Sequence, residues 1–414
     1  MAQDMVEDNP ECCVYDDVHS LVDGHAICVR HHRDGGKCKV LGCHSFGSGF
    51  SCTAISHYNV HSPSARATLL TGGNPTADTW KSSLAYMRDH RPWLATFENL
   101  DTLDDKSTEV QDSFLVDDSN LRQARQMLTD IGYMSFVLEM RSLEFGVPQD
   151  RRRTYIGAIA MELYGYDVPK AVASTERMID AIKQMKMPKP IDISSLTLPM
   201  DDDLVMLELQ YWQGVKANRD ESGNKDTAWQ AKHQDTFQKH GLRWGNLEPH
   251  WKTAASPWFD TLTEREKDIV VFTENSAPDV LSIDVSQSIG RHRPQVHSDL
   301  ALTCTPGEKR WDMTSRRLRV AQETFALQAI PWEDMDMSFD PPTLHSLAGN
   351  AWTGTVCMAF FMGMVVNLPL PRKAVPSSAG ASSSSAHAGL EHNQHAKEVE
   401  QDFDGDLSAQ LDDS

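Results

Sequence analysis

Apolar residues follow two spacings in the first third of the chain, helical periods and short continuous runs. Trp80, Leu84 and Met87 stand at positions i, i+4 and i+7, which predicts a helix that ends before Pro92. The run over 93–97 is short and continuously apolar, which is typical of a buried parallel strand. Helices that alternate with buried strands indicate an α/β fold.

The same alternation continues further along the chain. Ser119 is a fair N-cap for a second helix, and Gly132 closes it. Strands are expected over 133–138 and 154–159, and the apolar run over 356–366 predicts a returning helix. Together these elements predict one α/β domain built on a parallel-rich sheet.

The middle of the chain, about 160–310, has a different pattern. A helix is expected over 170–185, before a proline-rich break. A polar region with several tryptophans follows, and its helix over 261–269 begins with a capping-box pattern of Thr261 and Glu264. Aromatic side chains of this kind can stack on bases, but core packing is the simpler interpretation.

The chain is acidic and has no apolar run long enough to span a membrane. Its 414 residues are 40% hydrophobic, enough for a sizeable core, and the formal net charge is -20. This charge argues against binding nucleic acid through bulk electrostatics, so a polyanion would need local basic clusters. The candidates are 151–153, a second cluster over 309–319, Arg291 and Arg293. Without a secretory signal, we expect an intracellular protein with reduced cysteines.

The first 45 residues are unusually rich in cysteine and histidine. A zinc site is one interpretation, but no pair of CxxC elements is present. We therefore expect an acidic, partly ordered lead-in with a short strand over 12–15, and no metal. The residues concerned are Cys12, Cys13, Cys28, Cys38, Cys43, His19, His25, His31, His32 and His44.

Three short stretches carry groups that can do chemistry. The first, 49–56, places Cys52 among small residues, which leave its thiol within reach of a flat substrate. Taken alone, this cysteine could also be a buried structural thiol. The second stretch ends the strand over 93–97 with Glu98 and Asn99, at the edge where α/β proteins bind ligands. Taken alone, this pair could also be an Asx turn.

The third stretch, 145–153, ends in three consecutive arginines at the start of a strand. Three guanidinium groups are unfavourable to bury, so they must face solvent, an anion or carboxylates. Because side chains alternate along a strand, Arg151 and Arg153 are expected on one side and Arg152 on the other. A solvated turn is the simpler interpretation of such a charge run taken alone.

In this order the three stretches, with the sequences GFSCTAIS, FEN and FGVPQDRRR, resemble the cytosine-5 DNA methyltransferase family. That family has a proline-cysteine-glutamine loop, a Glu-Asn-Val strand end and a Gln-x-Arg-x-Arg element. Two later stretches agree, because 319–331 is similar to the ninth family motif and 349–366 to the tenth. The resemblance implies a Rossmann-like, S-adenosylmethionine-dependent methyltransferase fold with a smaller target-recognition insertion.

The resemblance also implies a division of the chain. Residues 1–160 would form the catalytic core, 161–310 the target-recognition region and 311–370 the return to the core. The remainder, 371–414, is Pro/Ala/Ser-rich and then acidic, so it is expected to be a disordered acidic tail.

By the same resemblance, four residues carry the chemistry. Cys52 would add to C6 of cytosine and make C5 nucleophilic, while Glu98 would hold N3 and the exocyclic amine. Arg153 would contact the base carbonyl, and Arg151 would orient Glu98 or bind a phosphate. The substrate would be double-stranded DNA whose target base is flipped out of the helix, which in a eukaryote places the protein in the nucleus.

The resemblance is weakest before Cys52. The family opens with a strand and a glycine turn that binds S-adenosylmethionine, and no strand–glycine–helix unit is found in this stretch. The run over 46–49 only imitates such a turn. Asp17 is similar to the third-motif aspartate near the adenine, and Asn350 belongs to the tenth motif, so both are candidate cofactor contacts. The fold is therefore expected to be N-terminally incomplete.

Two neighbours of the nucleophile depart from the family pattern. Ser51 stands where the family has proline, and Thr53 stands where it has glutamine. Loss of the proline, which fixes φ, predicts a looser loop. Two alternatives to an active DNA methyltransferase stay open. One is a catalytically impaired relic that binds nucleic acid or a partner, and the other is a tRNA cytosine-5 methyltransferase, since that branch shares these motifs.

Overall fold

The computed structural model describes residues 13, 15, 17–31, 36–52, 55, 69, 73–104, 119–222, 227–292, 294–297, 300–335 and 337–369. All of them belong to one compact unit, Met1–Pro369. The predicted tail over 371–414 and most of the stretch between Cys52 and the first α-helix lie outside this set. None of the helices among the described residues is long and apolar enough to cross a membrane.

A four-stranded sheet forms the centre of the N-terminal half, in the order β3-β4-β7-β5. Its strands are β3 (Ser45–Ser48), β4 (Leu94–Asn99), β7 (Arg152–Ala160) and β5 (Tyr133–Arg141). β3 and β4 are parallel, whereas β7 runs antiparallel to both β4 and β5. Three of the four strands therefore point the same way, as predicted. The reversal of β7 follows from its short link to β5, because strands joined so closely pair antiparallel.

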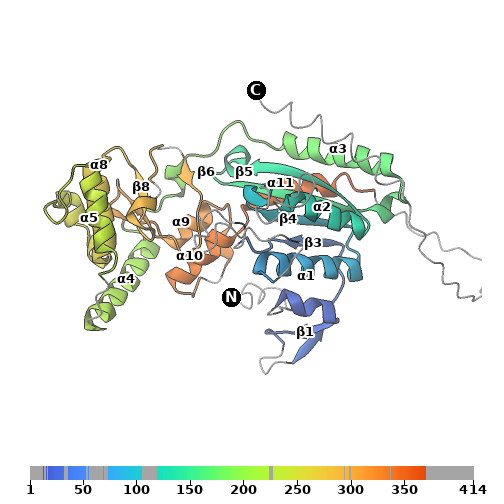
Figure 1. Cartoon of the computed structure of the whole chain (residues 1–414), viewed down its shortest axis with the longest axis horizontal. Helices are drawn as coiled ribbons and strands as arrows, with labels where there is room; N and C mark the ends of the chain where they lie inside the picture. Colours follow the sequence, from blue (N-terminus) through green and yellow to red (C-terminus); the bar gives the residue numbers. More distant parts are fainter. Residues whose placement is uncertain are drawn as a thin grey trace, which may run out of the picture. The chain divides into compact units, whose positions relative to one another are not determined.

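Helices cover both faces of this sheet, which confirms the predicted α/β class. α1 (Pro75–His90) and α2 (Asn120–Asp130) pack on one face. α3 (Val168–Gln184) and α11 (Gly354–Val365) pack on the other, so that α1 and α3 lie on opposite sides of the strands (Figure 1). The result is a helix–sheet–helix arrangement with an apolar layer on each side of the sheet.

Local signals set the ends of the first two helices much as predicted. Asn74 caps α1 by accepting the N–H of Ala77 at 2.9 Å, and Ser119 caps α2 by accepting the N–H of Arg122 at 3.2 Å. Gly132, just after α2, has a φ of 86°, a left-handed conformation that glycine adopts without strain. Both predicted helices and their boundaries are confirmed to within a few residues.

A small hairpin precedes the sheet in the chain. It consists of β1 (His25–Ile27) and β2 (Lys37–Lys39), and it follows the 3-10 helix η2 (Val18–Asp23). An apolar cluster that includes Tyr86 of α1 and Phe46 of β3 joins the hairpin to the four-stranded sheet and its helices. The short strand expected over 12–15 lies partly outside the described residues.

Residues downstream of α3 build a second hydrophobic core, which extends past the boundary predicted at 310 because Trp311, Leu318 and Val320 belong to it. Trp212 and Trp258 are buried in it and Trp244 packs against it, so core packing holds for these side chains, whereas Trp251 is exposed. The elements of this region are α4 (Asp203–Ser222), α5 (Gln230–Lys239), α6 (Trp251–Ala254), α7 (Pro257–Thr261), α8 (Glu264–Ser276), β8 (Ser282–Asp284), β10 (Arg310–Asp312) and β11 (Arg317–Leu318).

The helix predicted over 261–269 begins later than its capping pattern suggested. Thr261 ends α7, and the capping box is formed by Thr263 and Glu266, which bond to each other's N–H groups at 3.2 and 2.8 Å. The Thr-x-x-Glu pattern occurs twice in overlap at this point. The second copy forms the box because Glu266 is buried and also pairs with Lys309 at 3.0 Å.

The basic cluster predicted over 309–319 faces carboxylates instead of solvent. Arg310 and Arg317 are almost fully buried, and they pair with Glu308 at 3.3 Å and with Glu323 at 2.6 Å. These charges are neutralised inside the protein, so the prediction that they bind a polyanion is wrong. Their burial is tolerated because each guanidinium has a carboxylate partner.

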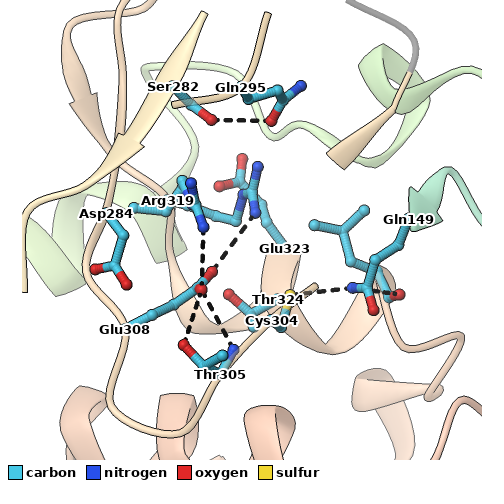
Figure 2. Close-up of polar contacts among 12 residues, drawn as sticks. Gln149, Ser282, Asp284, Gln295, Cys304, Thr305, Glu308, Arg319, Glu323 and Thr324 are labelled. Carbon is cyan, nitrogen blue, oxygen red and sulfur yellow. Dashed lines mark hydrogen bonds and ion pairs between the residues drawn. The ribbon is translucent and has the colours of Figure 1, made fainter. Parts of the chain in front are cut away.

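Polar contacts also join the two halves of the molecule. β6 (Gln149–Asp150) pairs in parallel with β9 (Ala301–Leu302). Beside this pair, Gln149 donates from Nε2 to Sγ of Cys304 at 3.1 Å (Figure 2). The segment that leads into Arg151–Arg153 is therefore fixed to the segment that follows β9.

The chain returns to the sheet through α9 (Ala321–Ala326) and α10 (Pro341–Asn350) into α11, which confirms the predicted returning helix. Glu323 of α9 accepts hydrogen bonds from both terminal nitrogens of Arg317, at 2.6 and 2.9 Å, and from the N–H of Leu198, at 2.8 Å. One buried carboxylate thus connects α9, β11 and the start of the second core.

Replacing Glu323 with glutamine should be strongly destabilising, because it leaves the buried guanidinium of Arg317 without its counter-charge. We expect the free energy of unfolding, measured by urea titration with tryptophan fluorescence, to fall by about 3–5 kcal/mol. Glu264, which is exposed and pairs with the half-buried Lys267, is the control, and Glu264→Gln should change the same quantity by less than about 1 kcal/mol. Equal effects of the two substitutions would contradict this account.

Candidate active site

A cleft of about 1090 Å³ opens where β4 ends and β7 begins, and its volume is ample for a nucleotide-sized ligand. Its walls come from the loop after β3, from the facing strand ends, and from segments of the second core and of α10. Lining residues include Gly49, Phe50, Ser51, Cys52, Glu98, Asn99, Arg151, Arg152, Arg153, Arg291, Cys304, Gly349, Asn350 and Trp352.

Hydrogen bonds from two neighbouring elements hold the loop that carries Cys52. Asn99, at the end of β4, donates from Nδ2 to the carbonyl of Phe50 at 3.0 Å. Thr79 of α1 accepts the N–H of Ser51 at 3.1 Å. A proline has no N–H and could not make this second bond. The expectation that Ser51 merely loosens the loop is therefore corrected, because a tether to α1 takes the place of the rigid proline ring.

Trp352 lies directly against the start of the same loop. A Cβ atom added to Gly49 would be 2.5 Å from Nε1 of Trp352, so only glycine fits at this position. Neither Trp352 nor Thr79 was predicted, because no sequence spacing connects them with Cys52. The run over 46–49 is strand β3 followed at once by the loop, which confirms that it is not a glycine turn before a helix.

The antiparallel pairing of β4 with β7 brings the end of one strand against the start of the other. Oε1 of Glu98 lies 3.2 Å from Nε of Arg153 and 3.7 Å from Nη2 of Arg151. Arg152 points the other way and pairs with Glu139 at the surface. The predicted alternation of the three arginines is confirmed, and carboxylate and guanidinium groups meet in the cleft.

Arg151 connects this cluster to the returning chain. It is 4% exposed, and it donates to the backbone carbonyls of Cys304 at 3.3 Å, Gly349 at 3.4 Å and Ala351 at 2.9 Å. Since these carbonyls occupy its guanidinium, the geometry favours the expected role of orienting Glu98 over the binding of a phosphate.

Glu98 is a buried carboxylate in the wall of the cleft. The residue is 7% exposed, and its Oε1 lies between the guanidinium groups of Arg153 and Arg151. Burying this charge is tolerated because two cations balance it.

Two thiols lie close enough to Glu98 to be affected by its charge, and their surroundings differ. Burial raises the pKa of Cys357 to about 11, and the carboxylate of Glu98 adds to this shift. Burial also raises the pKa of Cys52, but the guanidinium of Arg153 opposes this and Arg151 opposes it more weakly. Cys52 therefore has the cationic neighbours that stabilise a thiolate, and Cys357 does not.

The cleft is locally basic although the whole chain has a net charge of -20. Of the predicted candidates for contact with a polyanion, 151–153 and Arg291 line it, whereas Arg293 lies outside the described residues. In total five arginines and three carboxylates line the cleft, namely Arg141, Arg151, Arg152, Arg153, Arg291, Glu98, Asp101 and Asp150. A local excess of positive charge of this kind attracts phosphates.

The two predicted cofactor contacts lie in different places. Asn350 lines the cleft, whereas Asp17 caps η2 through the N–H of His19 at 2.9 Å and is not among the cleft residues. Within the described part of the chain, β1 and β2 pair only with each other, and no strand–glycine–helix unit precedes Cys52. These residues therefore do not form the glycine-lined cradle that a nucleoside cofactor would need.

Comparisons with known proteins agree with the family resemblance of the sequence motifs. A family model described as C-5 cytosine-specific DNA methylase matches residues 49–360. Among curated proteins no match is found. The solved structure of Schizosaccharomyces pombe Dnmt2 methyltransferase has a TM-score of 0.36 at 11% identity, covering 78% of this chain and 77% of that one. Entamoeba histolytica EhMeth has a TM-score of 0.34 at 12% identity, covering 79% and 78%. These structural similarities are distant, so the family assignment rests on the family model.

The thiol of Cys52 should become reactive only at raised pH. Because burial raises its pKa above the ordinary value of 9.0, the rate of its alkylation by iodoacetamide should rise through a midpoint above that value. Arg153→Ala removes the cation that lowers this pKa, so the midpoint should move further upward and alkylation at pH 8 should slow. Peptide mass spectrometry locates the modified cysteine, and a midpoint that moves downward in this variant would contradict the assignment.

Proposed function

We propose that this chain, which belongs to the C-5 cytosine-specific DNA methylase family, uses the Cys52 thiol to attack C6 of a cytosine held in the cleft. The observation that carries the proposal is the convergence of Cys52, Glu98 and Arg153, which come from three separate segments, on one cleft. Attack at C6 is the step that makes C5 of the ring nucleophilic enough to accept a methyl group.

The addition follows from the groups present. The thiolate of Cys52 forms a bond to C6, and the electron pair of the C5–C6 double bond moves into the ring toward N3. Glu98 would form hydrogen bonds with N3 and with the exocyclic amine, so that N3 carries a proton as negative charge develops. Arg153 would donate to the carbonyl at position 2 and stabilise the same charge. The position of Glu98 in the cleft wall, beside Arg153, supports this arrangement.

Double-stranded DNA is the proposed substrate. A cytosine inside a duplex cannot reach a thiol in this cleft, so the base would leave the stack and enter it. The local excess of arginines supports contacts with the flanking phosphates. Arg291, which follows β8 in the chain, lines the cleft as well and is a candidate for such a contact.

Members of this family take the methyl group from S-adenosylmethionine, and we propose the same donor for this chain. The described residues do not form its glycine-lined cradle, so the steps that we propose concern the base alone. Asn350 stays a candidate contact because it lines the cleft.

Covalent capture tests the proposal without any cofactor. DNA that contains 5-azacytosine offers an electron-poor ring whose C6 accepts a thiolate before methyl transfer. We expect a covalent adduct at Cys52, found by peptide mass spectrometry, and none in Cys52→Ala. Arg153→Ala should slow adduct formation by about 10²–10³ because it removes a donor to the developing charge.

Arg152 is the matched control for Arg153. The two side chains are neighbours in the sequence and both line the cleft, but Arg152 points the other way and pairs with Glu139, so Arg152→Ala should slow capture far less than Arg153→Ala. An adduct that persists in Cys52→Ala, or equal losses in both arginine variants, would refute the assignment of the nucleophile and its partners.

A second candidate function is a protein that binds cytosine-containing nucleic acid without turnover, and it is motivated by the described residues, which do not form a glycine-lined cradle. Supplying S-adenosylmethionine with unmodified DNA or tRNA separates the possibilities. Formation of 5-methylcytosine in DNA supports the methyltransferase, and its formation in tRNA alone would redirect the assignment to RNA. Capture of 5-azacytosine with no methylated product, and no heat of binding for S-adenosylmethionine in calorimetry, would support the binding protein.

A further inference from the structure

Four side chains of the N-terminal segment converge on one point, away from the cleft. The structure assigns a zinc site to Cys13, Cys28, His31 and Cys38. The donor atoms of all four residues lie within 4.8 Å of one another, and the candidate site is empty. The sequence analysis had predicted no metal here, because the stretch contains no pair of CxxC elements.

The distances fit a tetrahedral ion. Nδ1 of His31 lies 3.5 Å from Sγ of Cys13, 3.5 Å from Sγ of Cys28 and 3.5 Å from Sγ of Cys38. With Zn–S near 2.3 Å and Zn–N near 2.0–2.1 Å, a tetrahedral site separates sulfur from nitrogen by about 3.5 Å. Three equal distances of this length are what a shared central ion would impose.

Hydrogen bonding alone does not account for the cluster. A ring nitrogen has either one proton or one lone pair, so Nδ1 of His31 can bond well to only one of the three sulfurs at a time. The three cysteines form no disulfide with one another or with another described cysteine. A divalent ion would replace the three thiol protons and satisfy all four groups together.

The donor set defines the kind of metal and the kind of site. Three thiolates and one imidazole in tetrahedral array suit Zn²⁺. Since four protein groups fill the coordination sphere, no position is left for water or substrate, and the site is structural, not catalytic.

The location explains what such a site would stabilise. Cys38 stands in β2 opposite Ala26 of β1, and Cys28 follows directly after β1 and bridges to Tyr15. A hairpin with strands of three residues is too small to be stable by itself. The ion would tie it together and so fix the apolar cluster through which it packs on α1 and on Phe46 of β3.

Metal analysis of the purified full chain tests the site. After expression with zinc, elemental analysis should find one zinc per chain in the wild type and in Cys43→Ser, which removes an exposed thiol outside the cluster. Cys38→Ser should lose nearly all of this zinc. His31→Cys should keep it, because the variant still offers four ligands.

Replacement by Co²⁺ gives a second readout that needs no variant. Co²⁺ added to the metal-free wild type should give the thiolate-to-cobalt charge-transfer and intense visible bands of a tetrahedral sulfur-rich site, and Zn²⁺ should abolish them. Their absence would overturn the proposal even where Cys38→Ser fails to fold. Equal zinc contents in the wild type and Cys38→Ser would also overturn it. Neither result depends on whether the chain methylates cytosine.

Discussion

Two strands that run in opposite directions, β4 and β7, meet where one ends and the other begins, and the chemistry of this protein depends on that meeting. Pairing along six residues of β4 fixes the register. Glu98 at the end of β4 therefore stands beside the arginines that open β7, and Oε1 of Glu98 lies 3.2 Å from Nε of Arg153. A slip of one residue would turn each of these side chains to the other face of the sheet.

The same strand end also holds the loop that carries the proposed nucleophile. Asn99 follows Glu98 and donates to the carbonyl of Phe50, which ties the loop bearing Cys52 to the strand that carries the carboxylate. On the other side, Arg151 bonds to three backbone carbonyls of the returning chain. Burying this guanidinium is favourable only because it is surrounded by acceptors. The distant segments that form the cleft are thus joined through backbone and buried charge.

Much of this arrangement could be predicted from the sequence, because it is local. The caps Asn74 and Ser119, the buried face of α1 and the alternation of the three arginines all follow from spacings of a few residues. Convergence of Cys52 with Glu98 was predicted by the order of family motifs, not by spacing.

The sequence could not indicate which side chains meet when they lie far apart in the chain. The bond from Ser51 to Thr79 replaces a proline at long range. The carboxylates that neutralise Arg310 and Arg317 convert a predicted basic patch into a core. Likewise Cys13 and Cys38 meet His31 only because a bridge and a hairpin bring them together. Each of these contacts is set by tertiary packing, which overrides local pattern.

The most direct measurement is a crystal structure of the full chain captured on DNA that contains 5-azacytosine. The account predicts a bond from Sγ of Cys52 to C6 of an extrahelical base. It also predicts Glu98 within about 3 Å of N3 and of the exocyclic amine, with Arg153 donating to the ring carbonyl. A base bonded to another thiol such as Cys357, or a Glu98 that contacts only its two arginines and not the base, would contradict it.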